Sequence, residues 1–172
     1  MTMTARLFKK CALDFPACST VQILIGFALL LPSPVFAQAN SADFEQLQQT
    51  LESHDFTVML DLPPIQGSYG VLQVSSRTIW INPVVFDLKI AVPTIVHEAV
   101  HAAQLCSGSE GNLAPLNLGL VPYAGAYRLY TRYTGTRRTL EMEAYTIQAR
   151  PDRVEYVIDL LNSRCQTEFT TF

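Results

Sequence analysis

The stretch of the sequence that decides the fold is Pro93-Thr-Ile-Val-His-Glu-Ala-Val-His-Ala-Ala103. Pro93 suits the first turn of a helix, where its missing N–H group costs nothing. Apolar residues then recur at helical spacing, and Val96, Val100 and Ala103 share one face. This periodicity predicts a helix whose apolar face lies in a protein core, with the two histidines of the stretch on a different face.

The same stretch contains the motif H-E-x-x-H, formed by His97, Glu98 and His101. Residues four positions apart share one face of a helix, so both imidazoles can reach a single ion. Glu98 projects about 100° round the helix from His97, so it can reach a water on that ion without binding the ion itself. The chain has three histidines, and two of them are in this motif, which argues against incidental histidines on a solvent-facing helix. The motif predicts a Zn2+ site, whereas His54 is expected at the surface.

A catalytic zinc ion needs a third protein ligand. The extended motif H-E-x-x-H-x-x-G-x-x-H is absent, because Gln104 and Ser107 stand where glycine and histidine are required. The remaining candidates are Glu141 and Glu143, on a predicted helix that ends near Gln148. The two glutamates point about 200° from each other, so only one can bind the ion. Periodicity leaves the choice open, because both glutamates flank the apolar stripe of that helix.

H-E-x-x-H followed by a helical Glu-x-x-Ala, here Glu141 and Ala144, resembles the gluzincin type of zinc metallopeptidase. The resemblance implies that Glu141 completes the metal site of His97 and His101. It also implies that Glu98 is the catalytic general base, which takes a proton from water and delivers it to the leaving amine.

In the families that this pattern resembles, an aspartate that holds a ligand histidine follows the alanine. This chain has Tyr145 at that position, and either Tyr145 or Gln148 can take its part, because both share a helix face with Glu141. The resemblance also implies a zincin-like fold, in which a hairpin precedes the active-site helix and its edge strand pairs with an extended peptide substrate. Residues 69–81 occupy the place of that hairpin.

The sequence as a whole predicts an α+β fold. Helices are expected at residues 41–53, 93–103, 123–133, 136–148 and 151–165, and strands at 56–60, 69–74 and 78–81. The fold expected is a small zincin-like domain, with a short antiparallel sheet or hairpin packed on the active-site helix and followed by further helices. Tyr123, Tyr127 and Tyr130 recur at helical spacing, which is typical of core packing.

Residues 1–37 have the pattern of a secretory signal peptide, so residues 38–172 are expected to form the single domain. A positively charged segment precedes the apolar run 23–31, and Val35-Phe36-Ala37 offers a cleavage site. As a helix this run is about 14 Å long, against about 30 Å of membrane hydrocarbon. We therefore expect export to the periplasm or the outside medium, with no stable membrane anchor after cleavage.

Two cysteines, Cys106 and Cys165, remain after that cleavage. In an oxidising compartment they most simply form a disulfide. The alternative is a pair of buried free thiols.

The composition narrows the classes of function. The chain has 172 residues, of which 49% are hydrophobic and 16% charged, and this excludes a disordered protein. Its net charge of −3, without a stripe of lysine and arginine, argues against binding to nucleic acid. We expect an exported zinc-dependent metallopeptidase that acts on peptides or proteins. The alternatives are a catalytically inactive zincin-fold binding protein, which uses its groove or metal to hold a partner, and a structural helical domain in which the motif is accidental.

Overall fold

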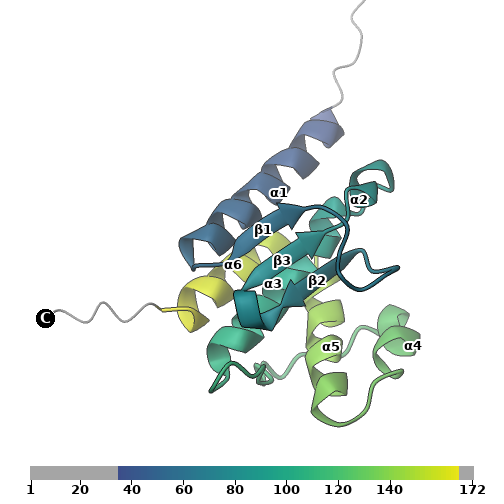
Figure 1. Ribbon diagram of the computed structural model, residues 1–172. Helices are drawn as coiled ribbons and strands as arrows, with labels where there is room; N and C mark the ends of the chain where they lie inside the picture. Colours follow the sequence, from purple (N-terminus) through teal and green to yellow (C-terminus); the bar gives the residue numbers. More distant parts are fainter. Residues whose placement is uncertain (1–34, 167–172) are drawn as a thin grey trace, which may run out of the picture. The chain divides into compact units, whose positions relative to one another are not determined.

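The computed structural model describes residues 35–166 and confirms the α+β class (Figure 1). The α-helices are α1 Val35–Ser53, α2 Val84–Asp87, α3 Ala91–Ser107, α4 Tyr127–Tyr130, α5 Gly135–Gln148 and α6 Arg153–Arg164. The strands are β1 Thr57–Leu60, β2 Gly70–Gln73 and β3 Thr78–Ile81, and the 3-10 turns are η1 Val74–Ser76 and η2 Ala124–Ala126. The predicted signal peptide lies outside the described residues over positions 1–34. No helix of the described part is both long and apolar enough to cross a membrane.

The three strands form a mixed sheet in the order β1-β3-β2. The predicted hairpin is present, since β2 and β3 pair antiparallel, with Gly70 opposite Ile81. The expectation of an antiparallel sheet was wrong for β1, which pairs parallel to β3. The chain reverses direction between β1 and β2 and again between β2 and β3, so β1 and β3 run the same way. Strand β3, with Ile79 and Ile81 fully buried, lies between the other two.

Helix α3 is the centre of the fold and packs against α1, α5, α6 and the two strands of the hairpin (Figure 1). The apolar face that the sequence predicted for this helix is fully buried, as shown by Val96, Val100 and Ala103. The core around it includes Phe44, Leu47, Leu51, Ile79, Ile81, Ile95, Ala144, Ile147, Val157 and Leu161. The two histidines of α3 are therefore held on a rigid, packed helix.

The predicted disulfide is confirmed, since Cys106 is bonded to Cys165. Cys106 lies in the last turn of α3, and Cys165 directly follows α6. The bond therefore fastens the end of the central helix to the end of the chain's last helix.

The prediction of one helix over residues 123–133 was wrong. The chain forms η2 and the single turn of α4 there, and Tyr123 and Tyr127 are 50% and 57% exposed, whereas Tyr130 is buried. A Cβ atom at Gly125 would lie 2.6 Å from the ring of Tyr123, so the ring folds back over a glycine at this turn. The helical spacing of the three tyrosines therefore does not place them on one buried face, because the backbone turns between Tyr123 and Tyr127.

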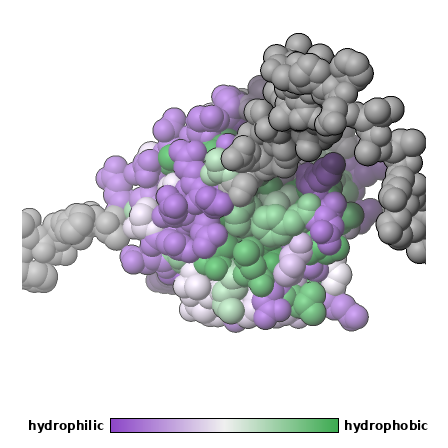
Figure 2. All heavy atoms as spheres, turned by 90° about the horizontal axis from the view of Figure 1, so that it is seen from above, coloured by the Kyte–Doolittle hydropathy of each residue, from purple (hydrophilic) through white to green (hydrophobic). Residues whose placement is uncertain are grey.

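Part of the described surface is hydrophobic. The exposed large hydrophobic side chains include Val84 and Phe86 of α2 and Leu88 directly after it. Figure 2 shows hydrophobic residues gathered on the face seen from above, bordered by hydrophilic ones.

Candidate metal centre

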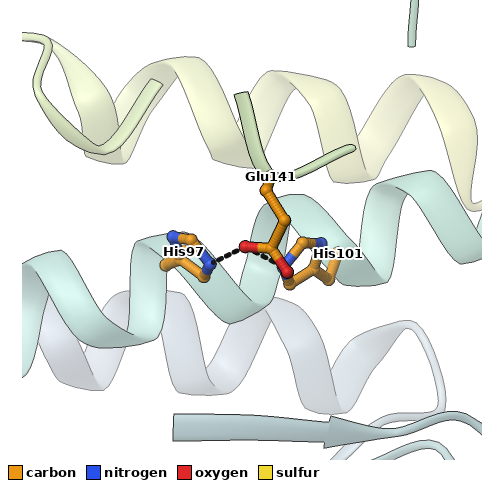
Figure 3. Close-up of side chains that lie close together, drawn as sticks. All are labelled: His97, His101 and Glu141. Atoms are coloured by element: carbon orange, nitrogen blue, oxygen red, sulfur yellow. Dashed lines mark ion pairs between the residues drawn. The ribbon is translucent and has the colours of Figure 1, made fainter. Parts of the chain in front are cut away.

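His97, His101 and Glu141 come together between α3 and α5 (Figure 3). The two histidines lie one turn apart on α3, and Glu141 points from α5 toward both of them. The Nε2 atoms of His97 and His101 lie 3.4 Å and 3.9 Å from Oε2 of Glu141. One potential ligand atom from each of the three residues lies within 4.8 Å of the others. This group can hold a metal ion.

The two separations from Glu141 are near those of a tetrahedral site. Ligand atoms about 2.1 Å from one ion are about 3.4 Å apart when they occupy the corners of a tetrahedron. The distance from His97 to Glu141 has this value, and the distance from His101 to Glu141 is larger, at 3.9 Å. Two imidazole nitrogens and one carboxylate oxygen also form a donor set that zinc accepts.

Each histidine makes its second hydrogen bond with a glutamine. Nδ1 of His97 lies 3.0 Å from Oε1 of Gln148, and Nδ1 of His101 lies 2.7 Å from Oε1 of Gln104. These contacts fix the rings so that both Nε2 atoms face Glu141. Gln148 therefore holds a ligand histidine, which is the role that the resemblance assigns to an aspartate. The ring of Tyr145 lies edge-on to that of His97, with 4.6 Å between the two ring centroids.

The charges of the group favour the forms that bind metals. Burial, together with the nearby His97, lowers the pKa of His101, so its imidazole is neutral at neutral pH. Burial would raise the pKa of Glu141, but its contacts with His97 and His101 hold that pKa below the usual value. A neutral imidazole and an ionised carboxylate are the states in which these side chains bind metal ions.

Glu98 is buried beside the three residues, where α3 meets strand β2. Burial raises the pKa of Glu98 to about 7, although the nearby His101 and, to a smaller extent, a hydrogen bond from the backbone of Leu72 oppose this rise. A Cβ atom at Gly70 would lie 2.8 Å from both Cγ and Oε1 of Glu98, so only glycine permits this close approach of β2. The carboxyl group of Glu98 can therefore take up and release a proton near neutral pH.

Of the two glutamates that periodicity left open, Glu141 faces the histidines and Glu143 does not. Glu143 is buried and accepts hydrogen bonds from the backbone N–H groups of Leu116 and Asn117 and from Nε2 of Gln104. No sequence pattern predicted this network, apart from the two acidic residues Glu141 and Glu143 two positions apart on one helix.

His54 lies outside the group, as predicted. Its Nδ1 lies 3.0 Å from the carbonyl oxygen of Cys165, and its Nε2 lies 3.0 Å from Oδ1 of Asn162. These contacts join the end of α1 to the end of α6, so the role of His54 is structural.

Comparisons with models of known protein families, with curated proteins and with solved structures found no match for this chain. The resemblance to gluzincins therefore stays a prediction, based on the motif of α3 and the glutamate of α5.

Proposed function

We propose that this protein is an exported zinc-dependent metallopeptidase. The observation that carries the proposal is the convergence of His97 Nε2, His101 Nε2 and Glu141 Oε2 from two packed helices. Glu98 lies on the same helix as the two histidines and is buried next to them. This combination provides a site for a metal ion and a proton acceptor beside it.

Zinc fits the site because His97, His101 and Glu141 supply three protein ligands of the type found in catalytic zinc sites, where the fourth position stays open. When bound there, zinc would activate water for attack and polarise the carbonyl group of the substrate. The chain's own part is to hold its three ligand atoms in the deprotonated form and to keep the rings oriented through Gln104 and Gln148.

Glu98 serves as the general base and then as the general acid. Its carboxylate takes a proton from the attacking water, and its carboxyl group delivers that proton to the amine that leaves. A pKa of about 7 suits both steps, because the group can exist in either form near neutral pH. The hydrogen bond from Leu72 holds the carboxylate against β2 during these transfers.

A peptide is the substrate that the sheet favours. Strand β2 is an edge of the sheet, and it lies against α3 at Glu98. An extended peptide can add to such an edge by main-chain hydrogen bonds. Its main-chain carbonyl groups would then lie near Glu98.

The disulfide is consistent with export of the chain. A bond between Cys106 and Cys165 persists in oxidising compartments such as the periplasm or the extracellular medium. The leader pattern of residues 1–37 agrees with that setting.

The test is metal analysis of the mature protein, purified without chelator, followed by incubation with a broad peptide library. We expect one zinc ion per chain and cleavage of peptides. Glu98→Gln should retain the zinc and lose the cleavage, whereas His101→Ala should lose both.

Full activity of Glu98→Gln would contradict the mechanism. Bound zinc without any cleavage by the unaltered chain would favour the inactive binding protein instead. Absence of stoichiometric zinc would favour an accidental motif.

A further inference from the structure

A chain of buried hydrogen bonds leads from His101 to a carboxylate that does not face the metal site. Gln104 is fully buried, and its Oε1 lies 2.7 Å from Nδ1 of His101. Its Nε2 donates to Oε2 of Glu143 at 3.0 Å and to the carbonyl oxygen of Leu140 at 3.0 Å. Glu143 is 5% exposed, so water has little access to this end of the network.

The donors and acceptors of this network fix the orientation of the Gln104 amide. The carbonyl oxygen of Leu140 only accepts hydrogen bonds, and Oε2 of Glu143 already accepts one from the N–H group of Leu116. The NH2 group of Gln104 must therefore face Glu143 and Leu140, which leaves its oxygen facing His101.

That oxygen in turn decides which nitrogen of His101 carries the proton. Because Oε1 of Gln104 can only accept, Nδ1 of the neutral imidazole must be the donor. The proton is then absent from Nε2, which presents its lone pair toward Glu141. A metal ion binds an imidazole through such a lone pair.

We propose that Glu143, acting through Gln104, is a positioning residue that sets the tautomer of His101 for metal binding. The inference rests on the metal site of the proposed function, which it deepens. Glu143 binds no metal in this account and contacts neither histidine. Its contribution is the direction of hydrogen bonding that it imposes on the network.

The same carboxylate also holds the segment that follows α3. Its two oxygens accept from the backbone N–H groups of Leu116 at 2.9 Å and Asn117 at 2.8 Å. Three donors thus converge on Glu143, and a carboxylate can accept from all three at once. Oε2 accepts from both Gln104 and Leu116, so a glutamine with its oxygen at that place would keep both of these hydrogen bonds.

The experiment therefore uses Glu143→Met, which keeps a side chain of similar length and has no oxygen to accept these hydrogen bonds. Gln104 then keeps only the carbonyl oxygen of Leu140 as an acceptor for its NH2 group, so its amide is held less firmly in one orientation. We expect the metal-free variant to populate the Nε2–H tautomer of His101, as read by long-range proton–nitrogen NMR. We also expect its affinity for zinc to fall about 10- to 100-fold, as for other partners of metal-binding histidines.

The exchange variant Gln104→Glu with Glu143→Gln provides the rescue. A carboxylate at position 104 accepts from Nδ1 of His101, and the amide at position 143 donates to that carboxylate. We expect the Nδ1–H tautomer and most of the zinc affinity to return, even though the fold is less stable because the carbonyl of Leu140 loses its donor and the N–H group of Leu116 loses its acceptor. If Glu143 only stabilised the fold, neither the tautomer nor the zinc affinity would return in the exchange variant. Glu155→Met, at an exposed position of α6, is the matched control and should leave tautomer and affinity unchanged.

The unaltered protein tests the inference even if the variants fail to fold. Its metal-free form must carry the His101 proton on Nδ1, and a proton on Nε2 overturns the inference. Unchanged tautomer and zinc affinity in a folded Glu143→Met also overturn it. These results differ from failure of the proposed function, which would appear as no zinc binding by the unaltered chain or as bound zinc without peptide cleavage.

Discussion

Replacing Gly70 by alanine tests whether β2 holds Glu98 in its working position. The added Cβ atom would lie 2.8 Å from Cγ and Oε1 of Glu98 and 3.0 Å from Cγ2 of Thr94. Contacts this short force a neighbour to move, and Glu98 is buried with little room to do so. None of these three atoms belongs to a proposed metal ligand, so the zinc content should stay the same.

The magnitudes follow from the type of contact. Overpacking of this kind costs about 1–3 kcal/mol of unfolding free energy, which lowers the unfolding temperature by about 3 °C per kcal/mol in a chain of this size. Displacement of a catalytic group by about 1 Å lowers the rate about 100-fold. We therefore expect Gly70→Ala to keep its zinc, to unfold at a moderately lower temperature and to lose about 99% of kcat.

The assays are zinc content, thermal unfolding and kcat on a peptide that the unaltered chain cleaves. Gln73→Ala is the control, since it places the same small side chain at an exposed position of the same strand. An unchanged kcat in Gly70→Ala would refute the reasoning that β2 positions the base. Loss of zinc from this variant would also contradict it, because Gly70 would then support the ligands rather than Glu98.

Three further predictions concern stability. Replacing both Cys106 and Cys165 by serine should lower the unfolding free energy by about 4 kcal/mol, because the bond closes a sequence separation of 59 residues; denaturant unfolding checks this, and a change below 1 kcal/mol would contradict it. Zinc at about 100 times its Kd should stabilise the unaltered chain by about 2.7 kcal/mol, and His101→Ala should abolish this gain in a thermal shift assay; an equal gain in the variant would place the metal elsewhere. Leu161→Ala should cost about 2–5 kcal/mol because this side chain is fully buried, whereas Leu129→Ala, at a 39% exposed position, should cost far less, and similar losses would contradict the packing described.

Local features of the fold could be predicted from the sequence. The periodicity of residues 93–103 indicated the central helix and its buried face, and the neighbouring strands expected at residues 69–74 and 78–81 indicated the hairpin. Two cysteines in a chain expected to be exported indicated the disulfide. Each of these follows from neighbours in the sequence or from a single pairing.

The position of β1 and the choice between the two glutamates depend on tertiary packing. Glu141 and Glu143 flank the same buried stripe of α5, so their roles depend on how α5 is rotated against α3. The resemblance to gluzincins favoured Glu141, but spacing alone did not. The role of Gln104 could not be predicted either. A single glutamine in an apolar helix forms no sequence pattern, and its hydrogen bonds become apparent only with its partners on α5.

The most direct test of the central claim is a crystal structure of the zinc-loaded protein, with anomalous diffraction recorded at the zinc absorption edge. The account predicts one peak, about 2.0–2.2 Å from Nε2 of His97, Nε2 of His101 and a carboxylate oxygen of Glu141. A peak bound by Glu143 instead of Glu141, or no peak between α3 and α5, would contradict it.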